Sequence, residues 1–173
     1  IVGYTQGAEY YGTENGKAVN VVKNYAGTYD DPAKGKECAL ALHDQGADVI
    51  FQIASATGDG VFEAAKENGF YAIGVDSDQS LQYVDDKAIQ EKFATSVIKE
   101  VGNAVYNVIG EYLDNGTLPF GEYEILGLSD GAVGIVEGDQ LNGLLSDEGK
   151  AKLEEAKAGI ADGSIEVKSA IGK

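Results

Sequence analysis

The stretch AIGVDSDQ at residues 72–79 decides the fold, because a short apolar strand ends there abruptly in two carboxylates. Two earlier stretches end in the same manner, in polar or aromatic residues: NVVKNYAGTYDDP at 20–32 and ADVIFQIASATGDG at 47–60. In an open parallel sheet, ligands bind in the crevice outside the carboxyl ends of the strands. The three strand ends therefore predict a small-molecule site, with Asp76 as the group best suited to hold a hydroxylated ligand.

Helices and short strands alternate on the N-terminal side of this stretch. Asp31 and Pro32 form a clear helix start, as N-cap and first helical residue. The near-continuous apolar strands favour an α/β fold whose parallel sheet is covered by helices on both faces. In chain order, we expect a helix at about 2–12, a strand at 18–24, a helix from Asp31 to Gly46, a strand at 47–53, a helix at 60–69 and a strand at 70–75.

Beyond Asp78 the alternation becomes irregular. Residues 79–92 are polar and predict a surface excursion, and residues 98–113 carry an apolar stripe at helical spacing. The pattern breaks near 79–93 and again near 114–131, as expected of a chain that crosses between two lobes. The remaining elements expected are strands at 93–97, 122–128, 131–137 and 164–168 and a helix at 147–163.

The composition excludes several classes of partner. The 173 residues hold 13 basic and 29 acidic residues, which give a formal net charge of −16. Nucleic acid and anionic membrane surfaces need basic residues to neutralise phosphates, so this chain would repel both. No apolar run is long enough for a membrane-spanning helix. Because the sequence does not begin with Met, we expect a processed product or a piece of a longer protein.

Catalytic and metal-binding motifs find little support. Cys38 and His43 are the only residues of their types and have no nucleophile or base constellation around them, so we expect structural roles. Residues 76–87 resemble a calcium loop superficially, but Leu81 and Lys87 occupy positions that require Gly and Glu. We expect Asp76 and Asp78 not to act as a catalytic pair: Asp76 is the candidate for binding ligand hydroxyls, and Asp78 is expected to shape the turn. We therefore expect no enzyme, no metal and no cofactor.

Two other segments allow more than one interpretation. Gly58 and Gly60 lie between a strand and a helix, where free backbone N–H groups can bind a ligand or where the chain simply turns. Tyr29 follows a strand and can stack on an aromatic ligand or remain an exposed turn residue.

Residues 25–80, from YAGTYDDP to GVDSDQS, resemble the basic membrane protein family of bacterial solute-binding lipoproteins, which includes purine-nucleoside receptors. The resemblance continues through TSVIKEV at 95–101 and LSDGAVGI at 128–135. It implies a type I periplasmic-binding-protein fold, in which two α/β lobes close on a ligand. On this basis residues 1–92 form most of the C-terminal lobe, 93–130 cross to an N-terminal lobe that is largely missing, and 131–173 return.

The resemblance also implies a set of ligand-binding residues. Tyr29 matches an aromatic residue that stacks on the base, and Ser55, Ala56 and Gly58 match a loop whose backbone approaches the ligand. Asp76 matches a carboxylate that binds the ribose hydroxyls, and Lys99 a lysine near them. An ionised carboxylate can accept from two vicinal hydroxyls at once. Family members often carry two glycines where this chain has Ser55-Ala56, which leaves the ligand class open.

The resulting expectation is an extracytoplasmic receptor for a purine nucleoside that delivers its ligand to an ABC permease. The membrane anchor would be an N-terminal lipid outside this sequence, since Cys38 lies mid-helix. A sugar or autoinducer-type polyol receptor of the same fold and a nucleoside-processing enzyme are the alternatives. Apolar surface left by the missing lobe would favour self-association.

Overall fold

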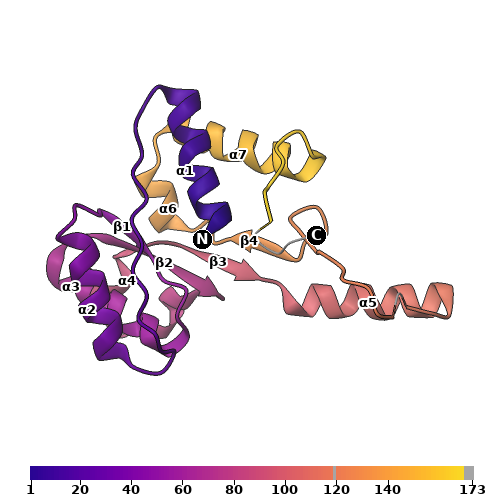
Figure 1. Ribbon diagram of the computed structural model, residues 1–173, viewed down its shortest axis with the longest axis horizontal. Coiled ribbons are helices and arrows are strands. Elements are labelled where there is room, and N and C mark those ends of the chain that lie inside the picture. Colours follow the sequence, from indigo (N-terminus) through magenta and orange to yellow (C-terminus); the bar gives the residue numbers. More distant parts are fainter. Residues whose placement is uncertain (119, 170–173) are drawn as a thin grey trace.

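A computed structural model describes residues 1–118 and 120–169 (Figure 1). Within them, four strands form one sheet in the order β1-β2-β3-β4. The first three strands are parallel, and β4 pairs antiparallel with β3. The strands are β1 (Val49–Phe51), β2 (Tyr71–Asp76), β3 (Phe93–Lys99) and β4 (Val133–Ile135).

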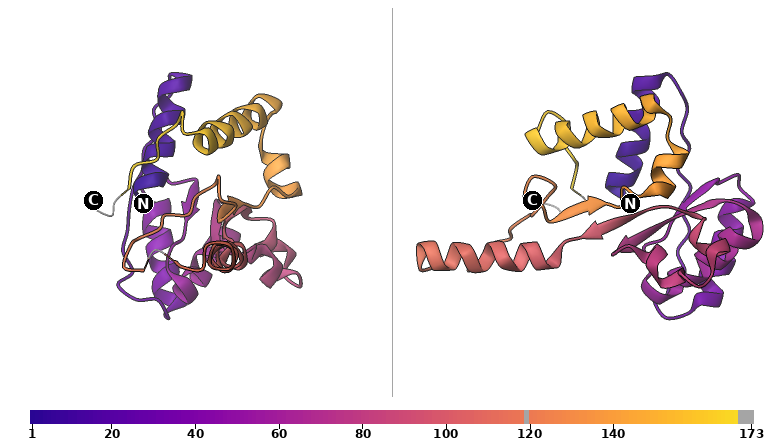
Figure 2. Two further views of the ribbon diagram at one scale, coloured as in Figure 1. Left: turned by 90° about the vertical axis from the view of Figure 1, so that its right-hand side faces the viewer. Right: turned by 180° about the vertical axis from the view of Figure 1, so that it is seen from behind.

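Helices lie on both sides of this sheet, which confirms the expected layered α/β fold. On one side are α2 (Pro32–His43) and α3 (Asp59–Asn68). Figures 1 and 2 show further helices gathered on the opposite side. These are α1 (Val2–Asn15), α6 (Asp139–Leu144) and α7 (Asp147–Asp162).

The N-terminus of α2 follows the sequence signal. Asp31 is the N-cap, and its side chain accepts a hydrogen bond from the Lys34 backbone N–H at 3.1 Å. Glycine then allows α2 and α3 to approach closely: a Cβ added to Gly60 would lie 1.8 Å from the carbonyl oxygen of Pro32. No side chain fits at that crossing, so the two helices start side by side at the carboxyl ends of the strands.

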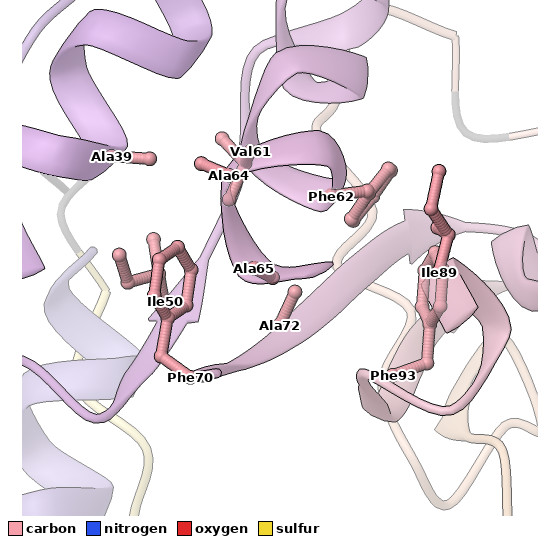
Figure 3. Close-up of a cluster of buried hydrophobic side chains, with 10 residues drawn as sticks. All are labelled: Ala39, Ile50, Val61, Phe62, Ala64, Ala65, Phe70, Ala72, Ile89 and Phe93. Atoms are coloured by element: carbon pink, nitrogen blue, oxygen red, sulfur yellow. The ribbon is translucent and has the colours of Figure 1, made fainter. Parts of the chain in front are cut away.

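The hydrophobic core lies between these two helices and the sheet (Figure 3). Phe62 is fully buried, and its ring centroid is 4.4 Å from that of Phe93. Residues 79–92 were expected to form a surface excursion; most of them are exposed or half-buried, but Gln79 is buried and Ile89 belongs to this core. That segment forms the short helices η2 (Gln79–Tyr83) and α4 (Lys87–Gln90), and each buries one residue beneath polar neighbours.

Three expected strands do not form, at 18–24, 122–128 and 164–168. Apolar β-formers become a strand only where a neighbouring strand pairs with their backbone groups. Tyr123, for example, is fully exposed. At 164–168 a side chain takes the place of a partner strand, because Gln6 donates to the Glu166 carbonyl at 2.5 Å and accepts from the Lys168 N–H at 2.8 Å.

The helix α5 (Val101–Asn115) leaves the sheet and extends away from the rest of the chain (Figure 2). We call this helix the α5 arm. It begins later than its apolar stripe suggested, because β3 continues to Lys99 by pairing with β2 and β4. None of its residues is buried. Its exposed apolar side chains are Val101, Val105, Tyr106, Ile109, Tyr112 and Leu113.

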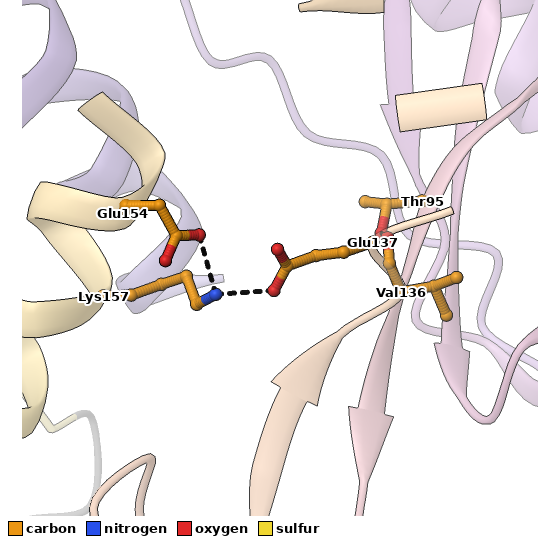
Figure 4. Close-up of polar contacts among 5 residues, drawn as sticks. All are labelled: Thr95, Val136, Glu137, Glu154 and Lys157. Carbon is orange, nitrogen blue, oxygen red and sulfur yellow. Dashed lines mark hydrogen bonds and ion pairs between the residues drawn. The ribbon is translucent and has the colours of Figure 1, made fainter. Parts of the chain in front are cut away.

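The return segment is attached to β3 and to α7 (Figure 4). The Thr95 hydroxyl donates to the Val136 carbonyl at 2.8 Å. Lys157 on α7 then bridges Glu137 at 2.5 Å and Glu154 at 2.9 Å. The α7 helix is thereby joined to the end of β4 by an ion-pair network at the surface.

Candidate functional site

The carboxyl end of β2 carries the first candidate site residues. Asp76 aligns with Ile98 of β3, so the next residue of β3, Lys99, lies beside it. The Lys99 ammonium is 2.7 Å from a carboxylate oxygen of Asp76, and both side chains are more than half exposed. The pair is therefore an accessible, mutually neutralised polar group at the sheet edge where ligands bind in parallel folds.

The carboxyl end of β1 leads into a short 3-10 helix, η1 (Ser55–Gly58). Ser55 has φ of 53° and Asp76 has φ of 66°; among the described residues they alone, other than glycines, adopt positive φ. This left-handed conformation is uncommon for residues with a Cβ and is concentrated at ligand-binding and active sites. The two strained positions are thus two of the residues predicted from the sequence.

The loop that carries Tyr29 is attached to η1 through Thr57. The Thr57 N–H donates to the Tyr29 carbonyl at 3.2 Å, and the Thr57 hydroxyl donates to the Thr28 carbonyl at 3.3 Å. The same hydroxyl accepts from the Asp31 N–H at 3.0 Å. The backbone around Tyr29 is held in place, whereas the Tyr29 ring is 71% exposed and free to contact a ligand.

The six predicted site residues all lie at the carboxyl ends of the parallel strands or in the loops beside them. Asp76 and Lys99 are in direct contact. Ser55 and Ala56 are exposed on η1, whereas Gly58 is buried, so a ligand would reach only its backbone. The structure gives no direct contact between Tyr29 and the ion pair, so a ligand would have to bridge them.

Sequence reasoning missed the buried polar residues beneath these loops. Thr57, Gln52, Gln79 and Ser96 are all less than 10% exposed. A signal was present, because Gln52 interrupts the apolar run VIFQIA and buried polar side chains need hydrogen-bond partners. Thr57 lies in the loop ASATGDG, where no apolar run marks it as a buried residue.

The site is an open wall and not an enclosed pocket. A hollow of about 200 Å³ lies elsewhere, between η2, β3 and α6, where Asp78, Thr95 and Leu141 contribute to its lining. The Asp78 carboxylate accepts from the Ser80 N–H at 3.1 Å and caps η2, which agrees with the turn-shaping role expected for it.

The residues that the structure describes, 1–118 and 120–169, offer neither a metal site nor a membrane-spanning helix. No cluster of three or more His, Cys, Asp or Glu side chains there could hold a metal ion. None of the helices there combines the length and the apolar character needed to cross a bilayer.

A layered α/β unit with polar residues at the carboxyl ends of its parallel strands is the kind of fold found in solute-binding proteins. The chain belongs to the family described as ABC transporter substrate-binding protein, PnrA-like, which matches residues 1–169. This confirms the resemblance drawn from residues 25–80, and the family is one of binding proteins and not of enzymes.

The curated relatives bear the name that the resemblance indicated. Basic membrane protein B of Borrelia garinii subsp. bavariensis is 40% identical over 136 residues, covering 77% of this chain and 37% of that protein. Basic membrane protein D of Borreliella burgdorferi is 35% identical over 143 residues, covering 82% and 39%. The chain thus spans less than two fifths of the length of these relatives.

Solved structures support the same fold. An ABC transporter solute-binding protein from Aeropyrum pernix K1 matches with a TM-score of 0.75 and 27% identity, over 95% of this chain and 52% of that one. A solute-binding protein from Conexibacter woesei, at 17% identity and a TM-score of 0.66 over 97% and 53%, shares the fold alone. This chain therefore corresponds to about half of each structure.

Proposed function

We propose that this chain supplies one wall of a purine-nucleoside site in the solute-binding protein of an ABC importer. Residues 1–92 and 131–173 would form most of the C-terminal lobe, and 93–130 would cross to an N-terminal lobe. The α5 arm supports this division, because its apolar stripe has no partner surface among the described residues. Delivery to a permease, an extracytoplasmic location and a lipid anchor outside this sequence complete the proposal.

The observation that carries the nucleoside assignment is the Asp76–Lys99 pair at the strand ends. An ionised carboxylate has about four acceptor positions, so Asp76 can accept from Lys99 and from two vicinal ribose hydroxyls together. The exposed ring of Tyr29 offers a face on which a purine can stack. Ser55, Ala56 and the Gly58 backbone would line the space between these two groups.

The electrostatics favour a nucleoside over a nucleotide. Lys99 is already paired with Asp76, so its charge is not available to a phosphate. The net charge of −16 further repels anions at low salt. A neutral, hydroxylated ligand with an aromatic base fits this wall best.

Calorimetric titration of the natural full-length protein tests the proposal, with inosine, adenosine and guanosine as ligands. AMP, ribose and free adenine serve as comparisons. Tight binding of a nucleoside, recovered unchanged, is the expected result. If ribose bound as tightly as the nucleosides, the protein would instead be a polyol receptor. This comparison is needed because Ser55-Ala56 replaces the two glycines that family members often carry and so leaves the ligand class open. Release of free base and ribose would show a nucleoside-processing enzyme.

Two variants locate the site. Asp76→Ala should weaken nucleoside binding by about tenfold to a hundredfold, since hydrogen bonds to charged groups contribute about 1.5–3 kcal/mol. Asp44→Ala is the matched control, because it removes an exposed carboxylate at the other end of α2. Equal affinities of the two variants would exclude Asp76 from the site.

The exposed stripe of the α5 arm also leads us to propose that the isolated chain self-associates. This second proposal concerns the 173-residue chain alone, in which nothing among the described residues covers the stripe.

A further inference from the structure

Three buried polar side chains meet beneath the loops that carry Ser55 and Asp76. Gln52 follows β1 and is 3% exposed, Gln79 follows β2 and is 8% exposed, and Ser96 lies in β3 and is 1% exposed. They come from three neighbouring strands or strand ends of the parallel sheet. Burying such groups is costly unless they are hydrogen-bonded, so their partners indicate what they do.

Each glutamine binds the backbone just before a left-handed residue. The side-chain oxygen of Gln52 accepts from the Ala54 N–H at 3.0 Å, one residue before Ser55. The side-chain oxygen of Gln79 accepts from the Val75 N–H at 2.8 Å, one residue before Asp76. Because both partners are donors, the amide orientation of each glutamine follows from the network.

The two glutamines are also bound to each other. The Gln52 amide nitrogen donates to the Gln79 oxygen at 2.7 Å, and the Gln79 N–H donates to the Ser96 hydroxyl at 3.3 Å. The loops after β1 and β2 are therefore joined through one continuous set of hydrogen bonds that is anchored on β3.

Two glycines leave the space that these side chains fill. A Cβ on Gly58 would lie 2.1 Å from the Gln52 side-chain oxygen, and a Cβ on Gly74 would lie 2.5 Å from the Ser96 hydroxyl oxygen. The network is thus tightly enclosed, and the Gln52 side chain occupies space that a side chain at position 58 would need.

We propose that Gln52 and Gln79 are positioning residues that hold Ser55 and Asp76 in their left-handed conformations and fix the spacing between the two ligand-binding loops. This inference deepens the proposed nucleoside site and rests on it for its effect on binding. The glutamines do not contact the ligand; they act through the backbone of the residues that do.

The test uses Gln79→Met and Gln52→Met in the natural full-length protein. Methionine has a similar length and no comparable acceptor, so each substitution removes the backbone hydrogen bond with little change in volume. A core variant such as Ile89→Val, with a matched loss of thermal stability, is the control. Gln79→Glu is the conservative variant, because its carboxylate can still accept from Val75 and Gln52.

The first measurement needs no ligand. Amide hydrogen exchange of Val75 should accelerate in Gln79→Met beyond the acceleration in the stability-matched control, and the amide resonances of Asp76 and Ser55 should shift. Unchanged exchange and unchanged resonances would overturn the proposal. The exchange measurement tests the positioning role even if the unmodified protein binds no nucleoside. Absence of nucleoside binding would contradict only the proposed function.

The second measurement is nucleoside affinity. Each methionine variant should lose about tenfold in affinity, and Gln79→Glu should recover part of that loss. The double variant should lose less than the product of the two single losses, because both residues act through one network. Affinity losses no larger than that of the core control would overturn the positioning role.

Gly58→Ala provides an independent check. Its added methyl group should displace Gln52 and lower affinity, whereas in a Gln52→Ser background the same change should cost little. If Gly58→Ala lowered affinity equally in both backgrounds, its effect would not pass through Gln52, which would count against the proposal.

Discussion

The helix α3 and the α5 arm are both amphipathic, but they differ in whether the apolar face is buried. Half of the ten residues of α3 are buried, whereas none of the 15 residues of α5 is. Both helices have apolar residues at helical spacing, and this spacing is more regular in α5 than in α3. An apolar stripe therefore predicts a face that needs a partner, but not that the chain itself supplies one. Four predictions test this difference between the lobe and the arm.

The largest expected effect is on the lobe core. Phe62→Ala should lower the free energy of unfolding by about 3–5 kcal/mol, because it removes a fully buried ring and leaves a cavity. Leu113→Ala, on the exposed face of the arm, should change it by less than about 0.5 kcal/mol. Urea unfolding of both variants measures the difference. Similar losses would mean that the arm is buried in solution.

The helix starts should differ by a smaller amount. Asp31→Ala should destabilise the chain by about 1 kcal/mol, because the Asp31 side chain caps α2 by accepting from the Lys34 N–H. Glu100→Ala should have little effect, since the Glu100 side chain makes no cap hydrogen bond at the start of α5. The same unfolding measurement compares the two, and a larger cost for Glu100 would contradict the structure.

Alkaline pH should destabilise the lobe through Tyr83. Burial raises the pKa of Tyr83 to about 12, assisted by the charges of Asp59 and Glu63 and by a hydrogen bond to Asp59. In the unfolded chain Tyr ionises near about pH 10, so between these two values the unfolded state loses its proton first and stability falls.

Tyr83→Phe should remove this part of the alkaline loss, whereas Tyr106→Phe on the arm should not. Comparing unfolding at pH 8 and pH 11 for both variants separates Tyr83 from the other groups that titrate. If both variants lost stability as the unmodified chain does, Tyr83 would not be responsible.

The smallest effect on stability, and the clearest effect on association, belongs to the arm. Leu113→Ser together with Tyr106→Ser should leave unfolding of the chain within about 0.5 kcal/mol. The pair should nevertheless reduce self-association in sedimentation velocity, because both side chains are at least 75% exposed on the apolar stripe. Glu111→Gln is the control on the same helix. An unchanged sedimentation profile would refute self-association through this face.

The order of the central elements could be predicted from sequence, because each has a local signal. Asp31-Pro32 marks the start of α2, and the apolar strands with polar ends mark β1 and β2. The strands expected at 18–24, 122–128 and 164–168 could not be judged in this way, since a strand depends on a neighbour that no local pattern reveals. The strand end singled out Asp76, the resemblance to a family added Lys99, and the structure shows that the two are in contact.

The hydrogen bonds of Gln52, Gln79 and Ser96 beneath the site could not be predicted from the sequence, for a different reason. Gln52 and Gln79 are 27 residues apart and become partners only when β1 and β2 pair. The positive φ of Ser55 and Asp76 was equally invisible, because neither residue is a glycine. Local patterns report which residues are unusual, and only the fold reports which of them meet.

The direct passage from β3 into α5 has a mechanical consequence. Only Glu100 separates Lys99, which contacts Asp76, from the first turn of a 15-residue helix. Such a helix is about 22 Å long, so a rotation of about ten degrees at this junction moves its far end by about 4 Å. The ion pair thus lies close to the junction, whereas the far end of α5 lies a whole helix length away from it. Any rotation of the backbone at Glu100 would therefore displace the far end of α5 much more than it displaces Lys99.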